Sequence, residues 1–482
     1  MSDSLYGRLR ELAESGLYSF HMPGHKRHFT DNDLMDWYSM DISEISGFDN
    51  LSFPEDILLS AQRKAAAFYQ ADETFYLING STAGILSAVS ALGIKENQKL
   101  LISRNSHYSV YHAAYLNRIS LVYIYPRDDE NGISKGITAL EVAEKLENNP
   151  DIGAILITSP TYEGVISDIA GIAKVAHKHN ISLVVDQAHG AHFGFHPLFP
   201  ENAVKQGADM VIHSLHKTLP ALTQTALLHV CGNRVNRDKL KRFLRIFQSS
   251  SPSYPLMAGI EQCLELVKKD GFQRFENMLK MKSELIDQLS QLMHFNPANQ
   301  IDDPCKLVII VKNNSFLKSK NIPLNGKHLK EILNKEYLLE MEMAADNYIV
   351  AIITIMDKPE GIKRLVDALL EIDSDIIVKH NEVQSCEFYS YEPKIMMPIH
   401  EALDGEVTEV PIDAACGHIA AEFVTLYPPA RPLLVPGEII DSHIVKLLLN
   451  YQSGGFSITG LNENGNLIVN KEMAIGYQCK SS

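Results

Sequence analysis

The chain has 482 residues, a length that indicates about three structural units of roughly 150 residues each. Its apolar fraction of 45% is typical of a globular protein that buries a large core. Acidic side chains number 59 against 44 basic ones, and the formal net charge of -15 argues against a nucleic-acid partner, because phosphate binding needs a basic face.

Residues 1–55 predict an irregular N-terminal arm. The opening segment MSDSLYGRLRELAESG lacks the long apolar core of a secretory signal, so we expect a cytoplasmic protein. No apolar run approaches the roughly 20 residues that span a bilayer, and we therefore expect no membrane partner. Pro54 is a favourable residue for a first helical turn, and a helix is expected to begin there.

Residues 56–300 alternate short β-rich runs with helical ones, which predicts an α/β domain with a mainly parallel sheet. Several runs are apolar at every position, as expected for strands that helices cover on both sides. The helical patterns TAGILSAVSALGI, ALEVAEKLENN and GIAKVAHKHN separate the earlier runs. The predicted strands are TFYLIN, KLLISR, LVYIYP, GAILITS, ISLVVD, DMVIHS and TALLHV.

Two smaller units are expected after residue 300. Residues 301–375 predict a small α+β domain, with strands CKLVIIVK, LEMEMA and YIVAIITI and helices near HLKEILNKE and GIKRLVDALLEI. Residues 385–482 include the proline-rich YPPARPLLVPGE and predict a separate C-terminal domain. The six cysteines form no C-x-x-C pair, so we expect reduced thiols and no metal site.

The sharpest local signal is a lysine that directly follows an apolar strand, Lys217 in the segment 213–218. Strand ends of a parallel sheet place side chains in the ligand crevice, where a lysine amine with a lowered pKa can attack a carbonyl group. For a lone lysine, a solvated loop residue is the better interpretation. The residues at the neighbouring strand ends change that balance.

Three other strand ends carry polar groups that suit one cofactor. Asp186 closes ISLVVD, and a buried carboxylate there needs a cation such as a protonated pyridine nitrogen. Ser81 and Thr82 begin a helix, where hydroxyls and backbone N–H groups can hold a phosphate. His107 follows KLLISR and could stack on a flat ring. Singly these are ordinary caps or structural residues, but with Lys217 they indicate a pyridoxal-phosphate (PLP) site.

The same segments resemble those of the bacterial Orn/Lys/Arg decarboxylases, which are PLP enzymes of fold type I. The resemblance implies an aspartate-aminotransferase-like large domain, a small α+β domain and the C-terminal domain of that family. Because FHMPGHK begins at residue 20, the chain is similar to the short members that lack an N-terminal wing domain. The other matching segments are NGSTAG (79–84), RNSHYS (104–109), PTYEG (160–164), DQAHG (186–190), SLHKTLPALTQTA (214–226), SSSPSY (249–254) and YPPARPLLVPGE (427–438).

The resemblance implies a role for each residue around the cofactor ring. Lys217 binds the cofactor aldehyde covalently, and Asp186 keeps the pyridine nitrogen protonated. His107 stacks on one face of the ring and Ala188 packs on the other. His189 is a further cofactor-binding residue.

The resemblance also implies the phosphate ligands and an assembly. Ser81, Thr82, Ser214 and His216 are expected to bind the phosphate. One serine of the run 249–251 is expected to reach the phosphate of a neighbouring subunit, and Ser250 is the predicted one. The implied assembly is a homodimer or a higher homo-oligomer with active sites at the interface.

The implied reaction converts a basic L-amino acid to its amine and CO2 in polyamine metabolism, with arginine or lysine favoured over ornithine. Lys217 or His216 would return a proton to Cα, and Asp41, Glu44 and Asp49 are candidates for binding the basic side chain. An aminotransferase or another PLP-dependent lyase on the same scaffold stays open as an alternative. A non-catalytic PLP-binding protein is a further alternative, although the sequence shows no appended DNA-binding motif.

Overall fold

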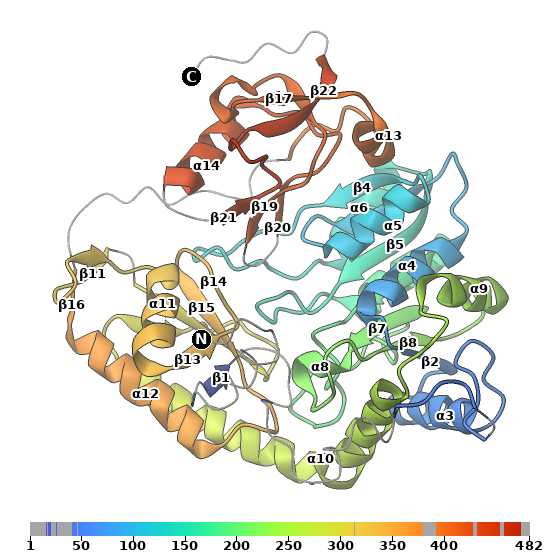
Figure 1. The fold of residues 1–482 in the computed structure, drawn as a ribbon, viewed down its shortest axis with the longest axis horizontal. Coiled ribbons are helices and arrows are strands. Elements are labelled where there is room, and N and C mark those ends of the chain that lie inside the picture. Colours follow the sequence, from blue (N-terminus) through green and yellow to red (C-terminus); the bar gives the residue numbers. More distant parts are fainter. Residues whose placement is uncertain are drawn as a thin grey trace.

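A computed structural model describes residues 16, 18–20, 26, 41–45, 47–312, 314–378, 392–427, 431–453 and 457–473. Within these ranges the chain forms a large α/β domain, a small α+β domain and a C-terminal β-rich domain (Figure 1). Most of the predicted N-terminal arm, including most of FHMPGHK, lies outside the described residues.

The large domain is built on a seven-stranded sheet with the order β2-β8-β7-β6-β5-β3-β4. Neighbouring strands from β7 to β4 are parallel, whereas β8 is antiparallel to both of its neighbours. Every strand predicted for this domain is present, and the prediction of a mainly parallel sheet is confirmed. The strands are β2 (Glu73–Leu77), β3 (Lys99–Ser103), β4 (Ser120–Ile124), β5 (Ile152–Thr158), β6 (Ser182–Asp186), β7 (Met210–Ser214) and β8 (Ala226–Val230).

Helices cover both faces of this sheet, which explains why its strands are apolar at successive positions. In β3, Leu100 and Ile102 enter the core on the α4 side, whereas Leu101 enters the core on the α7 side. Gly84 lets α4 approach the sheet, since a Cβ there would lie 2.6 Å from a methyl group of Leu77. The helices are α3 (Ile57–Tyr69), α4 (Gly80–Leu92), α5 (Tyr108–Leu116), α6 (Ala139–Asn148), α7 (Ile169–Lys178), α8 (Leu215–Thr218), α9 (Arg237–Phe247) and α10 (Tyr254–Leu289).

The predicted helix start at Pro54 is wrong, because α3 begins at Ile57. The carboxylate of Asp49 accepts hydrogen bonds from the backbone N–H groups of Glu55, Asp56 and Leu58. These bonds satisfy N–H groups just before and within the first turn and delay the start of the helix. They also occupy the carboxylate that the sequence suggested for the basic end of a substrate.

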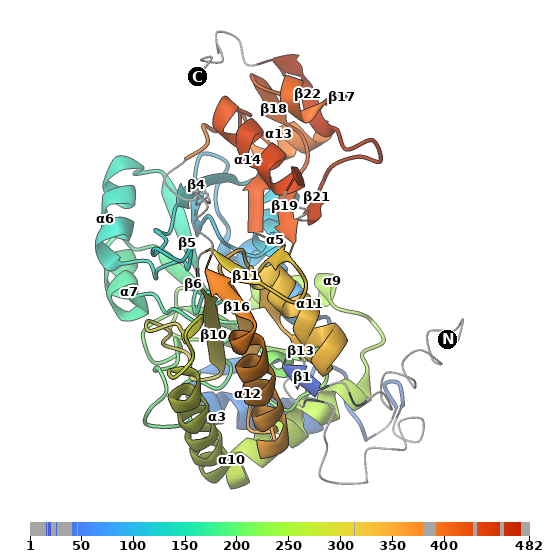
Figure 2. The same cartoon turned by 90° about the vertical axis from the view of Figure 1, so that its left-hand side faces the viewer.

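The small domain follows the long helix α10 and packs beside the large domain (Figures 1 and 2). The predicted strand LEMEMA is divided: Leu339–Met341 pairs with the N-terminal β1, and Met343–Ala344 pairs with β15. The strands are β1 (Tyr18–Phe20), β9 (Phe295–Pro297), β10 (Lys306–Val311), β11 (Ser315–Leu317), β12 (Ile322–Pro323), β13 (Leu339–Met341), β14 (Met343–Ala344), β15 (Tyr348–Ile352) and β16 (Ile376–Val378), and the helices are α11 (Gly326–Tyr337) and α12 (Pro359–Ser374).

The C-terminal domain is held to the large domain by a buried ion pair beside the sheet. Arg104, at the end of β3, contacts Glu438 at 2.9 Å and donates to the carbonyl of Pro432 at 3.0 Å. The elements of this domain are α13 (Ile399–Asp404), β17 (Val407–Val410), a 3-10 turn (Ile412–Ala414), β18 (His418–Ala420), β19 (Val424–Tyr427), β20 (Arg431–Leu434), α14 (Ser442–Ser453), β21 (Ser457–Thr459) and β22 (Leu467–Met473).

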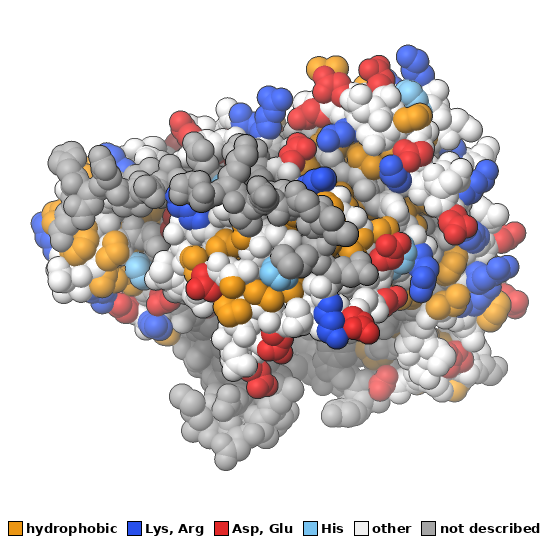
Figure 3. All heavy atoms as spheres, turned by 90° about the horizontal axis from the view of Figure 1, so that it is seen from above, with side chains coloured by type: hydrophobic (Ala, Val, Ile, Leu, Met, Phe, Trp, Pro, Cys, Tyr) orange, Lys and Arg blue, Asp and Glu red, His pale blue; other side chains and the backbone are white. Residues whose placement is uncertain are grey.

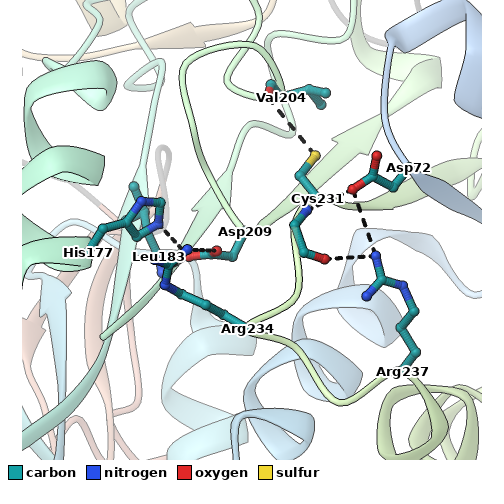
Figure 4. A network of polar contacts seen from close by, with 9 residues as sticks. Asp72, His177, Leu183, Val204, Asp209, Cys231, Arg234 and Arg237 are labelled. Carbon is teal, nitrogen blue, oxygen red and sulfur yellow. Dashed lines mark hydrogen bonds and ion pairs between the residues drawn. The ribbon is translucent and has the colours of Figure 1, made fainter. Parts of the chain in front are cut away.

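Asp209 joins strands at the end of the sheet opposite to Asp186. Its carboxylate accepts from Leu183 N at 2.8 Å and lies 3.1 Å from His177 Nε2 and 3.6 Å from Arg234 (Figure 4). Cys231 N donates to the carbonyl of Asp209, which ties β8 to the start of β7. We interpret this network as structural, because it joins the starts of β6 and β7 to the end of the antiparallel β8, away from the strand ends that carry Asp186 and Ser214.

The described cysteines differ in their bonding state. Cys231, Cys263 and Cys305 are free thiols, but Cys416 is disulfide-bonded. The prediction of reduced thiols is therefore wrong for Cys416, because sequence spacing does not reveal which thiols the fold brings together.

On the face shown in Figure 3, acidic and basic side chains lie interspersed. Among the described helices, none combines the length and apolarity needed to cross a membrane.

Candidate active site

A cavity of about 240 Å³ lies at the carboxyl ends of β5, β6 and β7. Strand carboxyl ends of an open parallel sheet are the usual location of ligands. Apart from Ser250, every residue predicted to bind the cofactor lines this cavity: Ser81, Thr82, His107, Asp186, Ala188, His189, Ser214, His216 and Lys217. The structure therefore brings these side chains together, while their individual roles remain predictions.

Ser250 does not line this cavity in the chain and is exposed. The adjacent Ser249 instead lines a larger cavity of about 590 Å³, between the start of α3, β2 and α9. None of the cofactor-binding residues predicted within this chain lies there, so the smaller cavity is the candidate site. Ser250 is exposed and could therefore contact a neighbouring subunit, but that contact stays a prediction.

One end of the cavity has the groups that an anion needs. Ser81 Oγ lies 2.6 Å from Ser214 Oγ, so the two predicted phosphate ligands adjoin each other. Ser214 ends β7, and Ser81 lies in the first turn of α4, where Asn79 makes no side-chain cap and instead accepts from Ser249 N at 3.1 Å. Gly80 has φ +72°, and a Cβ at this position would meet no atom within 4 Å. Gly80 N already donates to the carbonyl of Gln224, so the start of α4 offers a phosphate the hydroxyls of Ser81 and Thr82 and the positive end of the helix dipole.

Asp186 ends β6 and is 3% exposed. Its Oδ1 accepts from Ala188 N at 3.2 Å. Burial raises the pKa of this carboxyl, and the charge of Lys217 opposes that effect. A cationic group placed against Asp186 would favour the ionised carboxylate still further, so the site suits a protonated pyridine nitrogen.

His107 is the N-cap of α5, where its Nδ1 accepts from Ser109 N at 3.2 Å. Burial, with smaller effects of Lys217 and His112, lowers the pKa of His107 to about 4. The imidazole is therefore neutral near pH 7, which suits a ring that stacks on a flat cofactor. His216 lies next to Lys217, and its Nδ1 is 3.1 Å from the carbonyl oxygen of Thr225.

Lys217 lies in the short helix α8 and contacts His189, with Nζ and Nε2 3.0 Å apart. Burial lowers the pKa of Lys217 to about 8; Asp186 opposes this effect, and Lys306 adds to it. A lysine of this kind has far more free amine near neutral pH than an ordinary lysine, whose pKa is 10.5. The free amine is the form that reacts with an aldehyde.

Sequence reasoning missed two charged residues beside this lysine. Lys306, the first residue of β10, is 1% exposed, and its Nζ lies 2.8 Å from His189 Nδ1. Glu163 is also 1% exposed, lines the cavity and accepts from Tyr348 OH at 2.8 Å. A signal for Lys306 was present, because a lysine that begins the apolar run CKLVIIVK must be buried with a partner.

The acidic residues suggested for the basic end of a substrate do not line the cavity of this chain. The oxygens of Asp49 already accept four backbone N–H groups, which leaves this carboxylate less available to a substrate, and its role stays a prediction. Asp41 is exposed and Glu44 is partly exposed. The sequence suggested them because a basic side chain needs an acidic pocket, and acidity alone does not fix where a loop folds.

A second cluster, His192, Asp303 and Cys305, has the donor types of a metal site and lies within 4.8 Å. Its groups already bond one another: His192 Nε2 is 2.7 Å from Asp303 Oδ1, which also accepts from Cys305 N. Against the effect of burial, Cys305 and Asp303 raise the pKa of His192 to about 10. A protonated imidazole does not bind metal, so we interpret the cluster as structural.

Comparison with known proteins identifies the family. The profile for the Orn/Lys/Arg decarboxylase major domain matches residues 3–302, and that for the C-terminal domain matches residues 382–467. The chain belongs to the Orn/Lys/Arg decarboxylase family. The resemblance found in the sequence is confirmed, and with it the fold type I architecture and PLP as the cofactor.

Individual relatives agree with this assignment. The chain is 31% identical over 480 residues to an arginine decarboxylase of Bacillus subtilis, which covers 95% of each sequence. It is 22% identical to a lysine decarboxylase of Hafnia alvei over 86% of this chain and 67% of that protein. The solved structure of the constitutive lysine decarboxylase of Escherichia coli shares its fold with a TM-score of 0.76, at 18% identity, over 97% of this chain and 81% of that one.

Proposed function

We propose that this chain decarboxylates a basic L-amino acid with PLP as its cofactor, and that arginine is its substrate. The convergence of Lys217, Asp186 and the Ser81–Ser214 pair in one cavity carries the proposal, because a PLP enzyme needs an amine, a pyridine partner and a phosphate site together. The similarity to the arginine decarboxylase of Bacillus subtilis supports arginine over lysine and ornithine.

Bound PLP would supply an electron sink for the electrons that departing CO2 leaves behind. Asp186 would hold a proton on the ring nitrogen, and Ser81, Thr82 and Ser214 would fix the phosphate. His107 and Ala188 would limit movement of the ring. His216 and Lys217 lie next to each other and are the groups that would return a proton to Cα. The product amine would enter polyamine metabolism, and the proposed compartment is the cytoplasm.

The proposed substrate is tested by incubating the purified chain and PLP with arginine, lysine or ornithine in separate reactions. Mass spectrometry should detect agmatine from arginine at a rate at least tenfold above cadaverine from lysine or putrescine from ornithine. A predominance of cadaverine or putrescine would move the assignment to lysine or ornithine. A keto acid in place of an amine would support an aminotransferase, and no turnover of any of the three would contradict the proposal.

We further propose a homodimer with shared active sites. Ser249 and Ser250 are exposed, and a run of hydroxyls before α10 suits a phosphate that another subunit provides. Mixing inactive Lys217→Ala with an inactive triple alanine variant at residues 249–251 should therefore restore part of the activity. In such a hybrid, one site carries both lesions and the other carries neither.

Two controls make the mixing experiment decisive. Each variant mixed with itself should remain inactive, and co-expression replaces mixing if the subunits do not exchange in solution. Sedimentation of the unmodified chain measures its assembly directly. An active monomer, or hybrids without any recovered turnover, would contradict the shared site.

A further inference from the structure

Three side chains form a continuous line of contacts from the small domain into the cavity. Lys306 Nζ lies 2.8 Å from His189 Nδ1, and His189 Nε2 lies 3.0 Å from Lys217 Nζ. Lys306 is 1% exposed and His189 is 6% exposed, so bulk water has little access to these two side chains, whereas Lys217 is partly exposed to the cavity. Each nitrogen of one imidazole therefore faces a different lysine.

These two contacts restrict the protonation states of the three groups. An ammonium group only donates hydrogen bonds, and a neutral imidazole has one donor and one acceptor nitrogen. Two ammonium groups would require two acceptor nitrogens on His189, which imidazole does not have. Burial, with the charges of Lys217 and Lys306, keeps the pKa of His189 well below its ordinary value, so a doubly protonated ring is unfavourable. One of the two lysines is therefore a neutral amine.

We propose that Lys306 is a positioning residue that favours the neutral amine of Lys217 by donating a hydrogen bond to Nδ1 of His189. That bond leaves the ring proton of His189 on Nε2, from which it is donated to the lone pair of Lys217. The proposal rests on the cofactor role given above to Lys217. It goes beyond that role by naming the residues that set the protonation state of the amine.

The surrounding charges decide which lysine keeps the proton. Lys306 is opposed by burial but faces Asp303, Glu342, Cys305 and Glu163, each of which favours its charged form. Glu163 Oε2 and Asp303 Oδ2 are buried oxygens without a hydrogen-bond partner, and a positive charge nearby stabilises such carboxylates. His192 already pairs with Asp303 through Oδ1, and the charge of Lys306 favours the ionised Asp303 further.

Lys217 faces fewer compensating charges than Lys306. Asp186 and Glu342 favour its charged form, whereas burial and Lys306 disfavour it. His189 itself also faces His216 and His107, and both disfavour a charge on the ring. Lys306 is therefore the ammonium group and Lys217 the free amine.

The test follows the capture of PLP by the apoenzyme at different pH values, without any amino acid. Capture forms one carbon–nitrogen double bond between the aldehyde and the lysine and releases one water. The reaction needs the free amine, and the visible absorbance of the product measures its rate. For the unmodified chain we expect half-maximal capture rate near the lowered pKa of Lys217, about 8. In Lys306→Met the lowering charge is lost, the pKa of Lys217 rises, and the midpoint should move up by on the order of one pH unit.

Two further variants separate this effect from a general loss of structure. Lys282 is a partly buried lysine, and its Nζ donates to the carbonyls of Pro304 at 2.9 Å and Lys306 at 2.6 Å. Lys282→Met removes a partly buried ammonium that does not contact His189, so its midpoint should stay near that of the unmodified chain. Lys306→Arg keeps a charged donor, so its midpoint should lie close to that of the unmodified chain and well below that of Lys306→Met.

The opposite arrangement, with Lys217 as the ammonium group, makes a different prediction. The unmodified chain would then reach half-maximal capture near the ordinary pKa of a lysine side chain, 10.5, and Lys306→Met would leave the midpoint unchanged. Either result overturns the proposal, and the first needs no variant that might fail to fold. No capture of PLP by the unmodified chain at any pH would instead contradict the proposed function itself.

Discussion

Replacing Lys217 with alanine is expected to abolish both turnover and the visible absorbance of the bound cofactor. Lys217 Nζ is the amine of the cavity that lies beside Asp186, and alanine has no nitrogen to replace it. The purified variant should be colourless after incubation with PLP and dialysis. Residual decarboxylation should lie within the background rate of free PLP.

Lys282→Met is the matched control for this experiment, because it also removes a partly buried lysine, but one that does not line the cavity. It should keep the visible absorbance of the unmodified chain. If Lys217→Ala retains that absorbance, another lysine carries the cofactor and the assignment of the site is wrong.

Asp186→Asn is expected to keep some bound PLP and to lose activity by on the order of a hundredfold or more, as for the removal of other electrostatic stabilisers. An amide is nearly the same size as the carboxylate, so the cavity should keep its shape. An amide has no negative charge to hold the proton on the pyridine nitrogen. Turnover with arginine and cofactor content should be measured on the same sample.

Asp209→Asn provides the comparison, because both aspartates are buried and lie at opposite ends of neighbouring strands. Asp209 binds Leu183 N, His177 and Arg234, so its replacement should lower the melting temperature. Turnover per bound cofactor should change little in that variant. Near-normal turnover in Asp186→Asn would contradict the role of Asp186.

The large domain was predictable because its strands carry local information. A strand such as ISLVVD is apolar on both faces and ends in a carboxylate, and the structure gives it as β6 with Asp186 at its end. Helix beginnings were less predictable, because α3 is delayed by Asp49, a carboxylate outside the helix. The division of LEMEMA likewise depends on pairing with β1, which is more than 300 residues away.

The candidate site was predictable where its residues follow strands of one sheet. The carboxyl ends of parallel strands converge, so Ser81, His107, Asp186 and Lys217 could be grouped from their order alone. Lys306 could not be grouped with them, because it belongs to the small domain, and only the packing of the two domains brings it to His189. The position of Lys306 within an apolar run indicated that it has a buried partner, but the sequence did not show that this partner is His189.

Borohydride reduction of the PLP-loaded chain, followed by peptide mass spectrometry, tests the central assignment most directly. Reduction makes the bond between cofactor and lysine permanent, so the modified residue can be read from its peptide. Lys26 and Lys306 are alternatives to Lys217, because burial lowers the pKa of all three lysines, although Lys26 and Lys306 do not line the cavity. We expect the phosphopyridoxyl group on Lys217; its presence on Lys26 or Lys306, with Lys217 unmodified, would contradict the account.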